Sequence, residues 1–584
     1  MDILSLNKRL WAHFSSRRRI QVFLLLALII LTSLVEVVSI GAVIPFLSVL
    51  ADPEIVMQHQ NAKPFLDALA IKKPDDVVVL VIMGFIIAAL LSGFFRILLL
   101  WYQARLGQVI GTDFSSEMFR RTLYQPYHVH AKRNSSEVIS AVTRKTDQVL
   151  GGVINPSLGI LSSIILVVFI VFALFFISPS VTIFTFIVFS VIYSLLIIFT
   201  RNALYINSKA ISVGSNNIVK VVQEGLGGIR DVLIDSTQEV YYRGFRKSDL
   251  SLRRAQANTN VIGQTPKYLF ESLSMVLVAV IAYQLSQEMD GLIHAIPVLG
   301  AFALGAQKLL PALQQIYSHF STIRASQVSL SDTLELIEQD FSLANQGDLE
   351  NIKLSSGIVF NNVEYQYNED SSLAVKDLCF SIEKGACIGI IGKTGSGKST
   401  FLDLFMALLL PTKGSLCVDG VRIDAKNSRS WQKRIAHVPQ MIFLADATVA
   451  ENIAFGISKR DINLDKVRLA ARDAHIDEVI NSLELGYDTL VGEQGIRLSG
   501  GQRQRIGIAR ALYKEAEVLV FDEATSALDY ETEKEVMKSI HNSNRDLTIL
   551  MVAHRLSTLQ RCDRIIEFSR GEIKRQCSYS DIVD

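Results

Sequence analysis

The first 320 residues of the chain carry long apolar runs, whereas the rest has the pattern of an ordinary soluble α/β domain. A membrane-spanning helix needs roughly 20 mainly apolar residues to cross a hydrocarbon core of about 30 Å. Six stretches reach this length: 20–49, 77–101, 157–177, 181–200, 268–287 and 293–318. Glu271, Lys308 and Pro311 interrupt the last two, which are therefore weaker. The pattern predicts an α-helical domain with six membrane spans.

Lysine and arginine are unevenly distributed among the segments between these stretches. The N-terminal segment and residues 102–154 and 201–267 are rich in both, whereas residues 178–180 and 288–292 contain neither. Residues 51–76 hold three lysines against five acidic residues, and they are expected to form either a short external amphipathic helix or a solvated loop. Basic residues favour the cytosolic side of a membrane. Both termini and the soluble domain are therefore expected in the cytosol.

The two long basic segments also predict how the spans continue. Structureless loops of this length are uncommon in compact domains. Both segments are rich in helix-forming residues with apolar spacing, so the spans are expected to extend as helices into the cytosol, with turns at residues 125–128 and 225–228. A polar linker at 341–355 is expected to join a membrane domain, 1–340, to a soluble domain, 356–584.

Composition supports this division. A length of 584 residues calls for two or more domains. The mean hydropathy of +0.32 is high for a chain with 20% charged residues. A net charge of +1 gives no sign of nucleic-acid binding. All five cysteines lie in the second half without metal-ligand spacing, as expected for reduced cytosolic thiols.

A glycine-rich loop stands between an apolar strand pattern at 387–391 and an apolar helical run from Phe401. In that context, glycines let backbone N–H groups approach phosphates, and the helix N-terminus adds positive potential. We expect Lys398 to reach the β- and γ-phosphates of ATP and Ser399 to ligate Mg²⁺. The predicted nucleotide-binding residues of this loop are Gly392, Lys393, Thr394, Gly395, Ser396, Gly397, Lys398, Ser399 and Thr400.

Polar residues follow two further apolar strand patterns. Asp522 and Glu523 end the run that begins at Val518, and His554 follows the run 547–553. Asp522 is expected to hold Mg²⁺, and Glu523 is suited to polarise the attacking water. His554 is expected to contact the γ-phosphate and orient that water. The alternatives are a surface acid for Glu523 and a structural role for His554.

With Leu-Ser-Gly-Gly-Gln at 498–502, these motifs make residues 355–580 resemble the nucleotide-binding domain of ABC transporters at essentially full length. The resemblance implies that Tyr367 stacks on adenine, although it can also be a strand-face tyrosine. It implies that Gln440 senses Mg²⁺, and that residues 526–529 form the D-loop. Gln494 departs from the arginine usual in exporters. In the family, the segment Ser499, Gly500, Gly501 and Gln502 contacts ATP held by the other subunit.

This last property implies that two copies of the chain pair, with a homodimer as the simplest arrangement. Residues 1–340 resemble the six-helix half of ABC exporters. Within that family, residues 36–46, 125–135 and 223–232 resemble the branch that contains the bacterial flippase of lipid-linked oligosaccharides. The resemblance implies an ATP-driven flippase for such a glycolipid in the bacterial cytoplasmic membrane. Export of another lipid, a drug or a peptide is the alternative.

Three basic residues in or beside the spans are candidates for binding the transported lipid. Arg96 lies deep in the second span, Lys267 at the inner end of the fifth, and Lys308 near the middle of the sixth. Charges within spans are costly and usually face a cavity or a partner. Together these residues suit an anionic headgroup such as a pyrophosphate. Alternatively, Arg96 and Lys267 reach the inner headgroups, or Glu36 and Glu271 neutralise their basic neighbours.

Overall fold

The computed structural model describes residues 3–51, 73–177, 179–288, 292–339, 352–368, 372–525, 527–543, 546–553 and 555–583. The chain forms two compact units. The helical unit comprises Met1–Gln125 and Arg133–Asp340, and the α/β unit comprises Pro126–Lys132 and Phe341–Asp584. The short segment Pro126–Lys132, which sequence analysis placed in the membrane domain, thus groups with the α/β unit.

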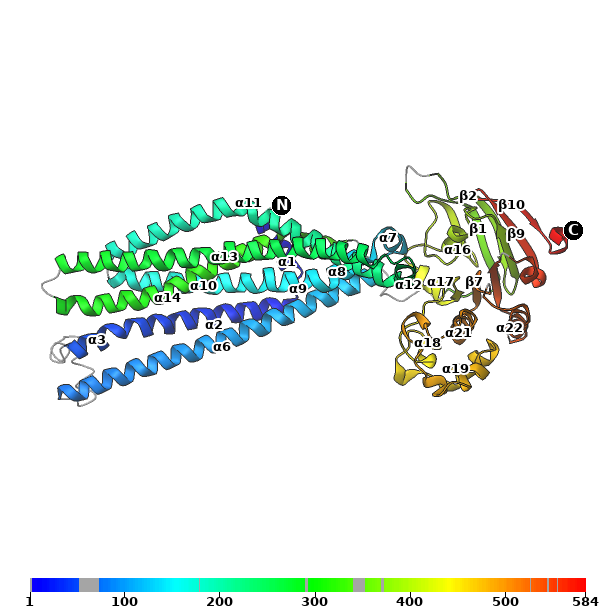
Figure 1. Cartoon of the computed structure of the whole chain (residues 1–584). Coiled ribbons are helices and arrows are strands. Elements are labelled where there is room, and N and C mark those ends of the chain that lie inside the picture. Colours follow the sequence, from blue (N-terminus) through cyan, green and yellow to red (C-terminus); the bar gives the residue numbers. More distant parts are fainter. Residues whose placement is uncertain are drawn as a thin grey trace. The chain divides into compact units, whose positions relative to one another are not determined.

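In the described part of the chain, the helical unit is built on six long helices (Figure 1). They are α2 (Ser16–Gly41), α6 (Pro74–Leu123), α10 (Asn155–Ile177), α11 (Pro179–Gly227), α13 (Gln238–Glu288) and α14 (Leu292–Ala325). The shorter elements are α1 (Ile3–Ala12), α3 (Val43–Ala51), α8 (Ser135–Ser140), α9 (Thr146–Val149), α12 (Ile229–Ile234), α15 (Gln327–Ile337) and the π-helical turns η1 (Ala141–Lys145) and η2 (Leu150–Ile154). Five of the predicted apolar stretches lie within one long helix each, and the first, 20–49, continues from α2 into the short helix α3.

Three of these helices are much longer than a membrane span. Helices α6, α11 and α13 have 50, 49 and 51 residues. At about 1.5 Å per residue each extends well beyond a hydrocarbon core of about 30 Å. Helix α6 ends just before Pro126 and α11 ends at Gly227, which confirms the predicted continuation of the spans and both predicted turns.

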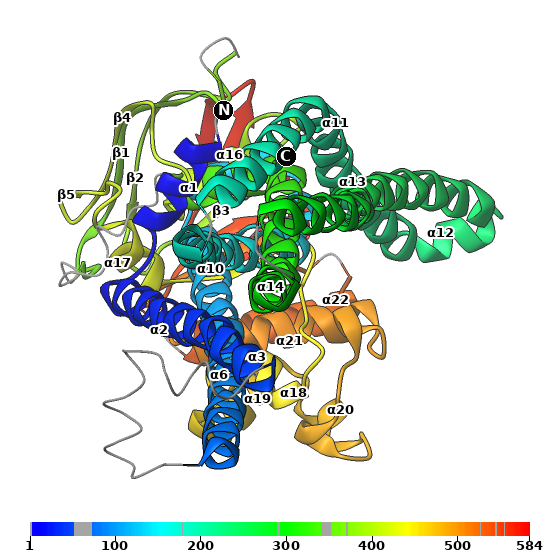
Figure 2. The same ribbon diagram turned by 90° about the vertical axis from the view of Figure 1, so that its left-hand side faces the viewer.

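The long helices pack in neighbouring pairs, α11 with α13, α10 with α14, and α2 with α6 (Figures 1 and 2). Helix α2 buries Leu25 and Ile29 in a core shared with α6 and α15. On α6, Leu90 and Ile97 are 69% and 70% exposed, an arrangement that water disfavours and a hydrocarbon environment permits.

Among the described residues, four segments are helical, long and apolar enough to cross a membrane. They are Ser16–Leu50, Pro74–Leu123, Ser135–Phe176 and Thr182–Gly227. They cover the first four predicted spans to within one residue at each end. The fifth and sixth lie on α13 and α14, parts of which fall outside the residues whose side chains are described. Most of the segment 51–76, with its predicted external helix, also lies outside the described residues.

The described residues of the α/β unit form two sheets. The six-stranded sheet has the order β10-β9-β3-β8-β7-β6, and the four-stranded antiparallel sheet has the order β2-β1-β4-β5. The strands of the first are β3 (Cys387–Gly392), β6 (Ile435–Val438), β7 (Val518–Asp522), β8 (Thr548–Val552), β9 (Arg564–Ser569) and β10 (Glu572–Cys577). Those of the second are β1 (Gly357–Tyr365), β2 (Val375–Glu383), β4 (Lys413–Val418) and β5 (Val421–Arg422).

Helices surround these sheets and connect their strands. They are α7 (Tyr127–Lys132), α16 (Lys398–Phe405), α17 (Ser428–Lys433), α18 (Val449–Ile453), α19 (Leu464–Asp473), α20 (Asp477–Asn481), α21 (Gly500–Tyr513), α22 (Tyr530–Ser543) and α23 (Ser580–Val583). The described residues of the unit also form the 3₁₀ turns η4 (Lys459–Asp461), η5 (Gly486–Asp488), η6 (Glu493–Gly495) and η7 (Leu556–Arg561).

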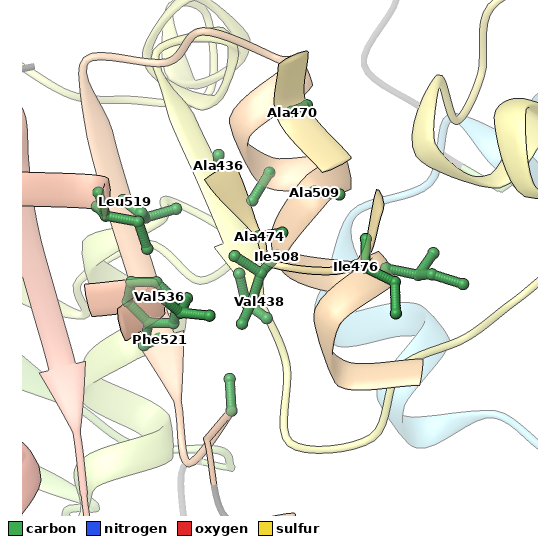
Figure 3. Packing of buried hydrophobic residues seen from close by; sticks show 14 of the residues in the cluster. Ala436, Val438, Ala470, Ala474, Ile476, Ile508, Ala509, Leu519, Phe521 and Val536 are labelled. Carbon is green, nitrogen blue, oxygen red and sulfur yellow. The ribbon is translucent and has the colours of Figure 1, made fainter. Parts of the chain in front are cut away.

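The central strands β3, β7 and β8 of the six-stranded sheet are buried on both faces, which explains their unbroken apolar sequences. Along β7, Val518 and Val520 face one core, whereas Leu519 and Phe521 face the other. Figure 3 shows the core that contains Leu519 and Phe521, in which Ile508 of α21 packs with side chains of β6 and β7. The two cores fix the sheet, and with it the loops that leave its carboxyl edge.

Candidate nucleotide-binding site

The register of three parallel strands brings the predicted motifs to one edge. Strand β8 lies between β3 and β7, and Val552 pairs with Ile390 on one side and Asp522 on the other. The carboxyl ends of parallel strands meet at one edge of a sheet, where open α/β folds bind ligands. The glycine-rich loop after β3 and the acidic residues at the end of β7 therefore leave the sheet together.

The glycine-rich loop has the backbone that its sequence requires. Gly395 and Gly397 have φ values of +79° and +104°, which disfavour residues with a side chain. A Cβ on Gly397 would also lie 2.8 Å from the carbonyl oxygen of Ala374. Gly397 precedes α16, so the N–H groups at the start of that helix point toward the loop. This arrangement suits an anion such as a phosphate.

Lys398 is enclosed by the loop that precedes it. Its side chain is buried, and Nζ donates hydrogen bonds to the carbonyl oxygens of Gly392, at 2.6 Å, and Lys393, at 3.0 Å. Ser396 Oγ is buried without a hydrogen-bond partner among the described residues, whereas Ser399 is exposed. The loop thus combines a positive charge, an unsatisfied hydroxyl and an accessible hydroxyl, which fits a nucleotide phosphate with Mg²⁺.

Asp522 and Glu523 occupy the same edge. Burial and the neighbouring Glu523 raise the pKa of Asp522, and Lys398 opposes this shift. Glu523 has a left-handed backbone with φ +52°, and its N–H donates to the carbonyl oxygen of Val552 at 3.0 Å. Gln440 Nε2 donates to Glu523 Oε2 at 2.7 Å. The structure therefore brings together Gln440, Glu523, Asp522 and Lys398, which are far apart in sequence.

Asp403 is an additional acidic residue at this edge that the motifs did not indicate. It lies on α16, and burial, with the nearby Asp522, raises its pKa to about 6. The sequence gives little indication that Asp403 belongs to the site, because it is a single acidic residue in an apolar helical run. Asp403 adds negative charge close to the candidate Mg²⁺ ligand Asp522.

Asp403→Asn is expected to stabilise the α/β unit at neutral pH. A folded-state pKa above the ordinary value of 3.8 means that the ionised carboxylate destabilises the fold as pH rises through this range, fully so above about 6. The gain in unfolding free energy is expected to be about 3 kcal/mol at pH 8 and smaller at pH 5. Thermal unfolding of the purified protein at both values measures it, with exposed Asp446→Asn as control. An equal gain at both pH values would contradict the assignment.

Tyr367 lies beside the start of α16. Its side chain is 43% exposed, and its hydroxyl shares a hydrogen bond of 3.0 Å with Thr400 Oγ1. Its carbonyl oxygen accepts a hydrogen bond from Lys132 Nζ at 3.0 Å. The exposed ring next to the glycine-rich loop is a suitable surface for a stacked base. The bond to Lys132 connects this position to α7.

The Leu-Ser-Gly-Gly-Gln segment begins α21. Ser499 caps the helix, with its Oγ accepting from Gln502 N at 3.2 Å and Gln502 Oε1 accepting from Ser499 N at 2.8 Å. A Cβ on Gly501 would lie 3.2 Å from the carbonyl oxygen of Ala527. Gln504 Oε1 accepts from Ala527 N at 3.0 Å. These contacts hold the predicted signature segment against the residues of the predicted D-loop.

Within one copy, this segment is not part of the cluster at the sheet edge. Helices α16 and α21 lie apart in the α/β unit (Figure 2). Among the described residues outside their own helix, the added Cβ atoms on Gly500 and Gly501 would meet only Ala527 and Leu528 within 4 Å. His554 and Ser526 lie outside the described residues. The predicted ATP-binding residues therefore form two separate groups, residues 392–400 with the acidic edge and residues 499–502.

The basic residues predicted for the transported lipid are also separated. Arg96 Nη1 and Lys308 Nζ lie 3.5 and 3.3 Å from Glu36 Oε1, so α2, α6 and α14 meet at one carboxylate. Lys267 instead lies 4.0 Å from Glu271, one turn along α13. The structure unites Arg96 with Lys308 through Glu36 and does not bring Lys267 to them.

Comparison with known proteins agrees with this architecture. The ABC transporter family matches residues 375–526, and the ABC transporter transmembrane region matches residues 20–303. A protein of Chromohalobacter salexigens named ATP-dependent lipid A-core flippase is 30% identical over 473 residues, 80% of each chain. A Burkholderia pseudomallei protein of the same name is 28% identical over 474 residues, 81% of this chain and 79% of the relative.

Two other similarities concern part of the chain or its fold. The toxin RTX-I translocation ATP-binding protein of Actinobacillus pleuropneumoniae is 36% identical over 282 residues, 48% of this chain and 39% of that protein. The structure of a bacterial Atm1-family ABC exporter with ATP bound has a TM-score of 0.79 at 22% identity, covering 97% of this chain and 96% of that chain. This last likeness confirms the predicted fold class. The chain therefore belongs to the ABC transporter family, as an exporter-type half-transporter whose helical transmembrane region is joined to one ATP-hydrolysing domain.

Proposed function

We propose that two copies of this chain form an ATP-driven flippase for a lipid-linked oligosaccharide or a related glycolipid in the bacterial cytoplasmic membrane. The observation that carries the proposal is the meeting of Arg96 and Lys308 at Glu36, on three predicted spans. Charged residues inside spans mark ligand paths or functional pairs. The relatives named as flippases of lipid A-core support a lipid as cargo.

ATP is proposed to bind with its base on Tyr367 and its phosphates on the loop 392–400. Lys398 and the loop N–H groups stabilise the negative charge of the phosphates. Mg²⁺, held by Ser399, Asp522 and Gln440, would neutralise charge on the phosphoryl oxygens. Glu523, held by Gln440, accepts a proton from the attacking water. His554, which follows β8, is proposed to orient that water.

Each ATP site is proposed to be completed by Ser499, Gly500, Gly501 and Gln502 of a second copy. Closure of the two α/β units over ATP, and their opening after hydrolysis, would drive the helices between two states. The proposed organisation is a membrane domain (1–340), a linker (341–355) and a nucleotide-binding domain (356–584), with both termini cytosolic. The excess of lysine and arginine in the extended segments supports this orientation.

Arg96→Ala and Lys308→Ala are each expected to lower flipping of a glycolipid with an anionic headgroup by at least about tenfold, because each removes one of two cations that bind it. Translocation is measured with a fluorescent lipid-linked oligosaccharide in proteoliposomes supplied with ATP. Lys267→Ala is the matched control, because Lys267 pairs with Glu271 away from this cluster. Flipping unchanged by the Arg96 and Lys308 substitutions would remove the cluster from substrate binding.

Export of another lipid, a drug or a polypeptide is the competing proposal. The similarity to a toxin translocation protein favours a polypeptide, although it covers only 48% of this chain. Reconstitution distinguishes these cargoes when the same proteoliposomes receive a lipid-linked oligosaccharide, lipid A-core or a labelled peptide. ATP-dependent movement of the oligosaccharide lipid supports the proposed function. Movement of the peptide alone would replace it.

A further inference from the structure

Glu36 is a buried carboxylate within the apolar run of the first predicted span. It lies on the face of α2 that also buries Ile29, Ser33 and Ile40, and its side chain is 2% exposed. A carboxylate removed from water without a partner is strongly destabilising. Glu36 has partners: its Oε1 atom pairs with Arg96 of α6 and with Lys308 of α14. One carboxylate oxygen therefore joins three helices.

The cluster is unbalanced in charge and in exposure. Two cations face one carboxylate, so the cluster has a net positive charge. The side chains of Arg96 and Lys308 are 51% and 34% exposed, whereas that of Glu36 is 2% exposed. The two cations are therefore accessible to a ligand and the carboxylate is not.

The two ion pairs are also loose. Their separations of 3.5 and 3.3 Å exceed the roughly 2.7–2.9 Å of a well-formed charge-assisted hydrogen bond. Glu36 Oε2 is buried without a hydrogen-bond partner in the described part of the chain. An arginine has five N–H donors and a lysine has three. The exposed cations can therefore exchange Glu36 for a stronger anion.

We propose that Glu36 is the internal counter-ion of an anion site, and that it competes with the anionic headgroup of the transported lipid for Arg96 and Lys308. The inference rests on the proposed function and adds a regulatory element to the same site. A headgroup that takes both cations leaves Glu36 buried and unpaired. Its binding then favours a state in which α2 separates from α6 and α14. Headgroup binding is thereby coupled to helix movement.

The test compares wild-type protein with Glu36→Gln, Glu36→Asp and Glu271→Gln in phosphatidylcholine nanodiscs. Glu271→Gln is the matched control, because Glu271 also pairs with a lysine, Lys267, but is 47% exposed. The probe is farnesyl pyrophosphate. Farnesol controls for the hydrocarbon chain, and inorganic pyrophosphate controls for the free anion. The dissociation constant of each compound is measured by equilibrium dialysis.

Glu36→Gln is expected to bind farnesyl pyrophosphate at least about tenfold more tightly than wild type, because the competing charge is removed. Glu36→Asp, whose carboxylate is one methylene further from the cations, is expected to be intermediate. Glu271→Gln is expected to match wild type, and farnesol to bind all four proteins equally. A gain in affinity cannot arise from misfolding, so the predicted direction separates this role from a structural one.

Unchanged or weaker binding in both Glu36 variants would overturn the counter-ion role, as would an equal gain in Glu271→Gln. Equal gains for inorganic and farnesyl pyrophosphate would overturn the lipid headgroup as the ligand and assign a free phosphate. Failure of the proposed function has a different signature. Proteoliposomes that flip no glycolipid, while Glu36→Gln still binds farnesyl pyrophosphate more tightly, would remove the flippase assignment and leave the counter-ion role intact.

Discussion

Replacement of Glu523 by glutamine is expected to lower ATP turnover by about 10²- to 10⁴-fold, the contribution typical of a general base. Glu523 follows the end of β7, its N–H is bonded to the carbonyl oxygen of Val552, and Gln440 holds its carboxylate at 2.7 Å. A glutamine has the same shape but cannot take a proton from water. ATP binding is expected to persist, because Lys398 and the glycine-rich loop are unchanged.

The result is checked by measuring phosphate release together with the amount of radiolabelled ATP retained after gel filtration. Glu523→Gln is expected to retain ATP in a closed dimer, whereas wild type releases it as ADP. The matched control is Glu531→Gln, an exposed glutamate at the start of α22. Turnover near the wild-type rate in Glu523→Gln would remove Glu523 from the proposed role. Loss of ATP binding would indicate a structural role instead.

Features determined by local sequence were predictable. Apolar runs located the long helices, because the length of a span is set by the thickness of the hydrocarbon core. The strand run from Val518 predicted β7, because a strand buried on both faces needs continuous apolar residues. The glycine-rich loop was predictable because its backbone needs positive φ values at Gly395 and Gly397, and glycine adopts these most easily. The capping box of Ser499 and Gln502 also has a local sequence signature, Ser-x-x-Gln.

Features that depend on long-range contacts were not predictable. The sequence offered Glu36 only as one of several possible partners, because nothing local indicates that α6 and α14 each bring a cation to it. The raised pKa of Asp403 depends on its burial and on Asp522, which is close in space but lies on β7, more than 100 residues later in the sequence. The grouping of Pro126–Lys132 with the α/β unit depends on contacts such as that of Lys132 with Tyr367.

Mixed dimers of two inactive chains are expected to recover ATPase activity if each site is shared between copies. Lys398→Ala removes the phosphate-binding ammonium, and Gly501→Glu places a bulky acid where a Cβ alone would lie 3.2 Å from the carbonyl oxygen of Ala527. Each variant alone is expected to form an inactive homodimer. In the mixed dimer, one shared site contains both substitutions. The other combines an unchanged glycine-rich loop from one chain with an unchanged signature segment from the other.

The expected recovery is up to about half of the wild-type rate if the sites act independently, and less if they are coupled. Differently tagged chains, co-expressed and purified through both tags, isolate the mixed dimer. The control pairs a Lys398→Ala/Gly501→Glu double variant with wild type, because this arrangement damages both sites. Within one copy, residues 392–400 and 499–502 form separate groups, so a site confined to one chain has no geometric support. Activity in the control dimer, with none in the dimer of Lys398→Ala and Gly501→Glu, would instead show that each chain hydrolyses ATP alone.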